Sequence, residues 1–265
     1  MPAQFCRDTL VPPLAIFCLN VVWLTPDHIT EREKPEMNVK IITIPLGFGQ
    51  CYVLKGDGVI AIDAGEPKKG AAFAYALESA EINPHDVKLL VLTHGHWDHI
   101  GSAMEIKSLT GAILTMHHSE AHWLENSLTP LSPGVTRWGK TFTALHKVFM
   151  PFIKIPKAKV DLVLGDDGLS LEDFGIPGRI VYTPGHSSGS VSVLLNTGEV
   201  FVGDLAMNKF PLRLSPGLPI FADDPAAVVN SWKMLIKLGA STVYPAHGSA
   251  FPIAVMEKAI FRAAS

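Results

Sequence analysis

The sequence predicts an α+β fold in which two mixed β-sheets pack together and helices cover their outer faces. Three observations predict it. From Met37 onward, short apolar runs alternate with longer segments that have helical composition. Turns at 55–58 and 196–198 contain glycine and join neighbouring runs as antiparallel hairpins. Apolar residues make up 48% of the 265 residues and charged residues 18%, which supplies a large core and excludes bulk disorder.

The amino-terminal half of the domain is expected to begin with strands and then to alternate strands with helices. Its predicted strands, which are short and rich in Val, Ile, Leu and Tyr, are 40–44, 51–55, 58–63, 88–93 and 111–116. A helix is predicted at 67–82, because this segment opens with a proline and is rich in Ala, Leu and Glu. Further helices are expected at 99–109 and 118–126.

The carboxyl-terminal half shows a similar pattern with more strands. The predicted strands are 161–165, 179–183, 190–196, 199–204 and 241–245. Helices are expected at 225–238 and 253–263, and Asp223, Asp224 and Pro225 form a cap for the first of them. We expect residues 37–265 to form one domain.

Residues 1–36 differ from the rest and are expected to be an N-terminal extension of unknown role. Their apolar run at 10–24 has 15 residues, whereas a membrane-spanning helix needs about 20. A leader or anchor is the alternative interpretation, but only one basic residue, Arg7, precedes the run and no A-x-A cleavage site follows it. Three widely spaced cysteines imply no disulfide framework, so a cytoplasmic location is expected.

The charge balance restricts the expected partners. Lys and Arg total 22 against 25 for Asp and Glu, giving a formal net charge of −3. Such a balance provides no electrostatic footprint for nucleic acid. We therefore expect a small-molecule substrate and no nucleic acid, and a homo-oligomer remains open.

A dense set of metal-binding side chains follows the strand predicted at 88–93. His94, His96, Asp98 and His99 lie within six residues. On a loop that leaves a strand, His94 and His96 can point the same way and bind one ion. Asp98 and His99 would then lie at the first turn of a helix and face a second ion. Imidazole with an added carboxylate is typical of catalytic zinc sites, and a polar loop of solvated histidines is the alternative.

Three further candidate ligands follow predicted strands in the same way. His186 comes after 179–183, Asp204 ends 199–204, and His247 comes after 241–245. Alone, each is a surface or cap residue as readily as a ligand. Their shared position just past a strand end favours convergence on one site.

Four of these segments resemble the motifs of the metallo-β-lactamase superfamily: THGHWDH at 93–99, TPGHS at 183–187, GD at 203–204 and PAHG at 245–248. Asp63, in AIDAG, resembles the first motif of that superfamily. The resemblance covers residues 37–265 and implies a four-layer αββα sandwich with the site at one edge.

The resemblance also implies how the ligands divide between two ions. One metal would take His94, His96 and His186. A second metal would take Asp98, His99 and His247, with Asp204 bridging the two. Asp63 would orient the ligand loop, as supporting carboxylates do in metal sites. A turn aspartate before Gly65 is the alternative interpretation of Asp63.

The expected activity is that of a dinuclear zinc-dependent hydrolase. A hydroxide bridging two divalent ions would attack a small ester, thioester, lactone or phosphodiester. Asp98 is the predicted catalytic residue, since its carboxylate can hold and orient the proton of that hydroxide. Zn²⁺ is the expected metal, with iron and manganese as alternatives. The alternative function is a mononuclear iron oxidoreductase similar to the persulfide dioxygenases of the superfamily.

One position departs from a branch of the family. Acyl-homoserine lactonases, which are similar in length and ligands, carry a tyrosine three positions after the bridging aspartate. This chain has Met207 there, which argues against a lactone without excluding it. Met207 is nevertheless predicted to contact the substrate.

The segment 126–160 is predicted to contain an amphipathic helix. Its apolar stripe consists of Trp138, Phe142, Leu145, Phe149 and Phe152. It also carries six basic residues and no acidic one. One interpretation is plain packing of the stripe against the domain. The other is a lid-like insertion in which Trp138 and Phe142 contact the substrate, with 136–153 contacting a membrane surface or a lipid-like molecule.

Overall fold

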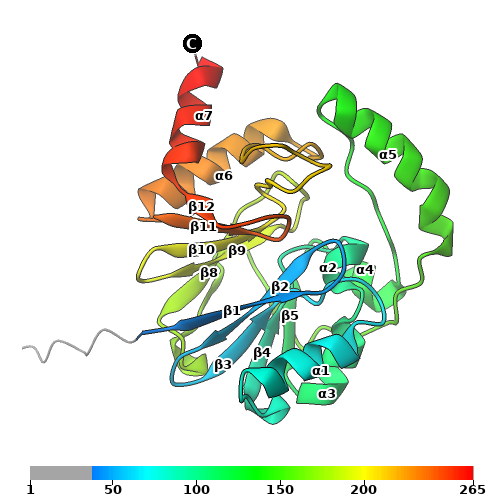
Figure 1. The fold of residues 1–265 in the computed structure, drawn as a ribbon, viewed down its shortest axis with the longest axis vertical. Helices are drawn as coiled ribbons and strands as arrows, with labels where there is room; N and C mark the ends of the chain where they lie inside the picture. The colour runs from blue at the N-terminus through cyan, green and yellow to red at the C-terminus, as the bar shows by residue number, and fades with distance from the viewer. Residues whose placement is uncertain (1–37, 265) are drawn as a thin grey trace, which may run out of the picture. The chain divides into compact units, whose positions relative to one another are not determined.

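The computed structural model describes residues 38–264, and the extension expected at 1–36 lies outside the described residues. Within the described part, the strands form two six-stranded sheets, in the orders β1-β2-β3-β4-β5-β6 and β12-β11-β10-β9-β8-β7 (Figure 1). The first sheet contains β1 Lys40–Pro45, β2 Gln50–Lys55, β3 Val59–Ile62, β4 Val87–Val91, β5 Ile113–His117 and β6 Leu162–Leu164. The second contains β7 Leu169–Ser170, β8 Gly178–Tyr182, β9 Val191–Leu195, β10 Glu199–Gly203, β11 Thr242–Pro245 and β12 Phe251–Pro252.

Both sheets are mixed, as the sequence predicts. In the first, β1 to β3 pair antiparallel and β3 to β6 pair parallel. In the second, β7 to β10 are antiparallel, and β11 runs parallel to β10. The predicted hairpins are confirmed as β2–β3 and β9–β10. Parallel strands end at the same edge of a sheet, so the loops after β4, β8, β10 and β11 can meet there.

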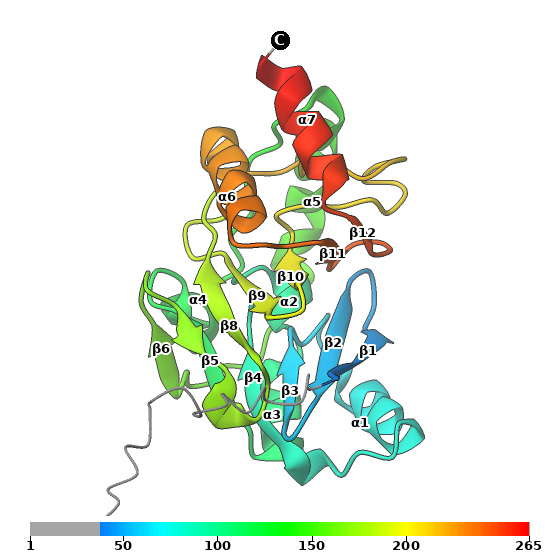
Figure 2. The same ribbon diagram turned by 90° about the vertical axis from the view of Figure 1, so that its left-hand side faces the viewer.

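Three hydrophobic cores separate four layers. Helices α1 (Gly70–Ser79) and α3 (Ala103–Thr110) cover the outer face of the first sheet, where Phe73 packs in one cluster with Leu90. Ile62 and Val193 belong to the core between the two sheets. Helices α6 (Pro225–Lys237) and α7 (Ala254–Ala264) cover the second sheet through the fully buried Trp232 (Figure 2). The αββα sandwich is therefore confirmed.

The helices near the predicted ligands differ from expectation. The helix predicted at 99–109 is divided into α2 (Trp97–Ile100) and α3. It is interrupted because the Gly101 amide donates to the carbonyl of Gly65 at 2.9 Å, and the Ser102 hydroxyl accepts from the Lys69 amide at 2.7 Å. The Gly101 amide and the Ser102 hydroxyl thus stabilise the loop after β3 and the start of α1. Strands β7 and β12 were not predicted, because each is only two residues long and so shows no alternation of apolar and polar residues.

The segment 126–160 contains one helix, α5 (Arg137–Phe149), which is followed by a 3-10 turn at Met150–Phe152 and preceded by α4 (Ala121–Asn126) (Figure 1). The apolar stripe does not pack as a whole against the sandwich. Phe142 is half-buried, whereas Leu145 and Phe149 are each 57% exposed. The helix is attached through the Trp138 indole, which donates to the carbonyl of Pro211 at 2.8 Å.

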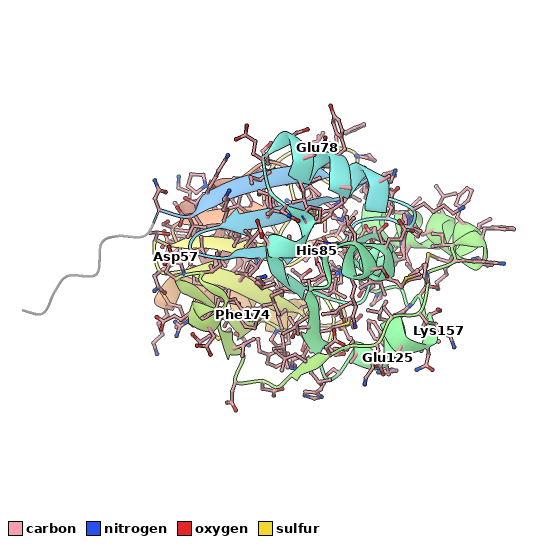
Figure 3. All side chains as sticks on the ribbon, turned by 90° about the horizontal axis from the view of Figure 1, so that it is seen from below. Asp57, Glu78, His85, Glu125, Lys157 and Phe174 are labelled. Carbon is pink, nitrogen blue, oxygen red and sulfur yellow. The ribbon has the colours of Figure 1, made fainter. Side chains whose placement is uncertain are left out.

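The opposite end of the sandwich carries none of the predicted ligands. There the β2–β3 turn contacts the segment after the 3-10 turn Glu172–Phe174, since the Asp57 amide donates to the carbonyl of Gly175 at 3.1 Å. Figure 3 shows Asp57 and Phe174 on this face, together with His85 from the 3-10 turn Pro84–Asp86. Across residues 38–264, no helix combines the length and apolar character needed to cross a membrane.

Candidate metal centre

The structure brings all seven predicted ligands together where four strands end. His94 and His96 lie on the loop after β4, and Asp98 and His99 lie in α2. The other three follow β8, β10 and β11 and are His186, Asp204 and His247. Six of the seven are buried, and Asp98 is partly accessible. We refer to these seven side chains as the ligand cluster.

The ligand cluster contains three overlapping groups in which the ligand atoms lie within 4.8 Å of one another. The groups are His94–His96–His186, His94–His99–Asp204 and Asp98–His99–His247. The first and third match the two metal-binding sets that the resemblance implies. Asp204 lies between them, with Oδ1 at 3.2 Å from Nε2 of both His99 and His247, and Oδ2 at 3.6 Å from Nε2 of His186.

Several buried atoms of the ligand cluster either make no hydrogen bond within the described chain or face only other members of the cluster. They are Nε2 of His94, Nε2 of His99, Oδ1 of Asp204 and Nδ1 of His247. A buried polar atom without a partner is costly, and such atoms normally have one. Three imidazole nitrogens and a carboxylate oxygen are a donor set that suits divalent zinc, iron or manganese. The residues therefore fit a metal centre.

Neighbouring groups contact Nδ1 of His94 and of His186 and thereby orient these two rings. Nδ1 of His94 lies 3.1 Å from the Thr93 hydroxyl, which itself donates to Asp63. Nδ1 of His186 lies 3.0 Å from the carbonyl of Phe221. Because a carbonyl can only accept, Nδ1 of His186 carries the proton and Nε2 presents its lone pair. Such partners fix the tautomer of a metal-binding histidine.

Asp63 occupies the supporting position that the resemblance implies. Its carboxylate accepts from the Thr93 amide at 2.8 Å and faces Nδ1 of His99 at 2.9 Å. It also lies at φ 63°, a left-handed conformation that few residues other than glycine, asparagine and aspartate adopt. The loop after β3 thereby directs the carboxylate toward the start of the ligand loop. Its role in metal binding remains a prediction.

Comparison with known proteins agrees with this geometry. The family model described as the metallo-beta-lactamase superfamily matches residues 44–247. The chain belongs to the metallo-β-lactamase superfamily. The match contains four of the motifs in full and PAHG as far as His247.

Relatives within the superfamily are distant. An uncharacterized protein of Mycobacterium tuberculosis is 29% identical over 212 residues, which cover 77% of this chain and 87% of that protein. The hydroxyacylglutathione hydrolase GloC of Haemophilus influenzae is 25% identical over 182 residues, covering 66% and 77%. The crystal structure of ST1585 from Sulfolobus tokodaii has a TM-score of 0.59 and 26% identity, covering 85% of this chain and 86% of that one.

The ionisation of the ligand cluster also suits a cation. Burial lowers the pKa of His94, and it lowers that of His96 to about 3, so both rings are neutral and able to bind metal. Burial also opposes protonation of His99 and His247. The surrounding carboxylates, Asp204 first among them, together outweigh this, raising the pKa of His99 well above its usual value and that of His247 to about 9. A divalent cation would replace protons that the carboxylates attract to this buried site.

A supporting role for Glu120 was not predicted. Its side chain contacts two loops of the ligand cluster, the one after β4 and the one after β8. The side chain is fully buried, and its two carboxylate oxygens accept from the amides of Gly95 and Gly189, each at 2.6 Å. Burial raises the pKa of Glu120 above its usual value. Gly95 separates His94 from His96, so Glu120 fixes the loop between two ligands. No local pattern marks this role, since Glu120 and Gly189 are 69 positions apart.

A second group of possible ligands, His117, His118 and Asp166, was also not predicted. It lies at the ends of β5 and β6, where Nε2 of each histidine is 3.2 Å from Oδ1 of Asp166. His118 and Asp166 are exposed, unlike the ligand cluster. Any experiment that counts bound metal must therefore distinguish metal in the ligand cluster from metal at His117, His118 and Asp166.

A cavity opens onto the ligand cluster. It is lined by five of the predicted ligands and by Phe142, which was predicted to contact the substrate. Trp138 and Met207, for which the same prediction was made, do not line the cavity. Trp138 is directed to Pro211, as described above. Met207 is fully buried behind the cavity wall, where its amide pairs with the carbonyl of Gly217.

Proposed function

We propose that this chain is a dinuclear metal-dependent hydrolase, with Zn²⁺ as the expected metal, that cleaves a small carboxylic ester or thioester. The observation that carries the proposal is the overlap of the three ligand groups at His94 and His99, with Asp204 in the middle group. A mononuclear site would use one group only. Two cations would engage all three groups.

The ligand cluster divides into two sets of side chains that would hold the metals. His94, His96 and His186 would hold one ion, and the remaining ligands would hold the other, with Asp204 contacting both. A pair of divalent cations, when bound, lowers the pKa of a water toward 7 and polarises the substrate oxygen.

Asp98 supplies the proton chemistry of the proposed reaction. Burial works against its ionisation, but the neighbouring His99 and His247 lower its pKa to about 2, so it is a carboxylate at neutral pH. Oδ2 lies 3.3 Å from Nε2 of His247, and the side chain borders the cavity. The carboxylate can therefore accept a proton from the attacking water and transfer it to the leaving group.

The bond class rests on two observations. The relative named hydroxyacylglutathione hydrolase supports cleavage of a thioester, which is an acyl-transfer reaction. The cavity contains no lysine or arginine that could bind a phosphodiester. A lactone is the less favoured substrate, because Met207 provides no hydroxyl at the position of the tyrosine in similar lactonases.

Metal analysis combined with a substrate panel tests the proposal. We expect about two zinc ions per chain in protein purified without chelator, and turnover of an ester or thioester in a panel that also contains a lactone and a phosphodiester. Asp204→Asn should lose bound metal and turnover together. Asp166→Asn, in the exposed group, is the matched control and should retain turnover.

The same experiment can contradict the proposal. One iron per chain with consumption of oxygen would instead support the mononuclear iron oxidoreductase. Retained turnover in Asp204→Asn would show that the ligand cluster is not the site of hydrolysis.

A further inference from the structure

One side of the cavity above the ligand cluster is apolar and mostly aromatic. We refer to it as the aromatic wall, which consists of Phe48, Trp97, Leu131, Phe142, Leu212 and Phe221. We propose that the aromatic wall is a subsite for an uncharged, apolar acyl group, so that the substrate is the ester or thioester of a medium-length fatty acid. This inference rests on the proposed function.

The rings of the aromatic wall pack against one small core and reach the ligand cluster. The ring centroids of Phe142 and Phe221 are 5.6 Å apart. Within the same wall, the centroid of Phe48 is 5.2 Å from that of His247. A group attached to a carbonyl at the ligand cluster would therefore extend along aromatic rings. Burying such a group releases water from apolar surface on both partners.

The wall is supported from behind and is therefore preformed. Met207, Leu212 and Ile220 form a small buried core against which Phe48, Phe142 and Phe221 pack. The α5 backbone approaches this core closely, since a side chain at Gly139 would lie 2.1 Å from the carbonyl of Ile220.

Among the described residues, those that line the cavity include no lysine or arginine. Outside the ligand cluster and the aromatic wall, the lining residues are Ser132, Thr143 and His146. The lysine nearest to the wall is Lys209, whose Nζ donates to the carbonyl of Phe48 and lies 5.0 Å from the centre of that ring, outside the lining. A carboxylate of glutathione placed within the lining would therefore have no lysine or arginine in contact with it.

Binding and turnover can be measured separately on the metal-loaded protein. N-methyl alkanamides of increasing acyl length, which are neutral and resist hydrolysis, serve as binding probes in calorimetry. We expect the Kd to fall about fourfold for each added methylene until the wall is filled. For turnover, kcat/KM should rise from the acetate to the octanoate ester of one alcohol, and a hydroxyacylglutathione should be at least about tenfold poorer than a neutral octanoyl thioester.

Two variants on α5 form a matched pair. Phe142→Ala should lower the octanoate-to-acetate ratio of kcat/KM by about tenfold. Phe149→Ala removes an identical ring from the exposed side of the helix and should leave the ratio within about twofold. Phe142→Leu keeps most of the apolar volume, so it should fold and give an intermediate ratio even if the alanine variant does not.

The outcomes distinguish this inference from the proposed function. Binding of the N-methyl alkanamides that depends on acyl length, without any ester turnover, would support the subsite and refute the hydrolase. Turnover with no dependence on chain length, or with preference for the hydroxyacylglutathione, would refute the subsite. Equal ratios in Phe142→Ala and Phe149→Ala would also refute it.

Discussion

The ligand cluster and the aromatic wall border the same cavity but are built differently. The ligands follow strand ends, are buried, and are oriented by groups such as Asp63 and Glu120 that belong to the sandwich. The wall takes Phe142 from α5, whose following turns leave Leu145 and Phe149 of the same stripe exposed. The proposed chemistry thus depends on the geometry of two sheets, whereas the proposed substrate choice depends on a helix and loops outside them.

The first prediction separates the two regions by the kind of effect. His186→Ala removes a predicted ligand, so kcat/KM should fall by more than about 100-fold for short and long esters alike. The octanoate-to-acetate ratio should not change, because the wall is intact. Steady-state kinetics on both esters checks this. A ratio that changes as much as it does in Phe142→Ala would show that the two regions are not separable.

The second prediction concerns the support beneath the ligand cluster. In Glu120→Gln, the amide can replace only one of the two acceptor oxygens that face the amides of Gly95 and Gly189. A buried amide left without its acceptor should lower the free energy of unfolding by about 1–3 kcal/mol, as measured by urea denaturation. Glu78→Gln, at an exposed position of α1, is the control. An equal free energy of unfolding in Glu120→Gln and Glu78→Gln would show that Glu120 does not support the ligand loops.

The smallest expected effect involves His146, on the cavity side of α5. Burial lowers the pKa of His146 below 6.5, so the native state favours the neutral ring. The unfolded state then binds more protons near its own pKa, and the stabilising contribution of His146 is lost as pH falls through about 6.5. The Tm advantage of the native protein over His146→Gln should therefore shrink between about pH 8 and pH 5. A constant difference would contradict this.

Much of the fold and of the ligand cluster could be predicted from local sequence. His94 to His99 directly follow a buried strand, and spacing alone indicates metal chemistry. The same holds for His186, Asp204 and His247, because parallel strands bring their ends to one edge. The αββα arrangement came from the resemblance, which the family match confirms.

What could not be predicted depends on contacts between distant segments. Glu120 acts through Gly189, and the carbonyl of Phe221 orients His186, 35 positions away. Met207 was assigned by its distance from Asp204, but the chain turns it into the small core behind the wall. The periodicity of the apolar stripe correctly predicted the helix α5. It could not show that, of the stripe, only Phe142 would line the cavity.

The central claim is that one cluster of side chains holds two metals. A crystal structure of the zinc-loaded protein, with anomalous data collected at the zinc absorption edge, tests it most directly. We predict two anomalous peaks within the ligand cluster, about 3.5–4 Å apart and both in contact with Asp204. A single peak at His94, His96 and His186, with Asp98 and His247 paired only with each other, would contradict the account.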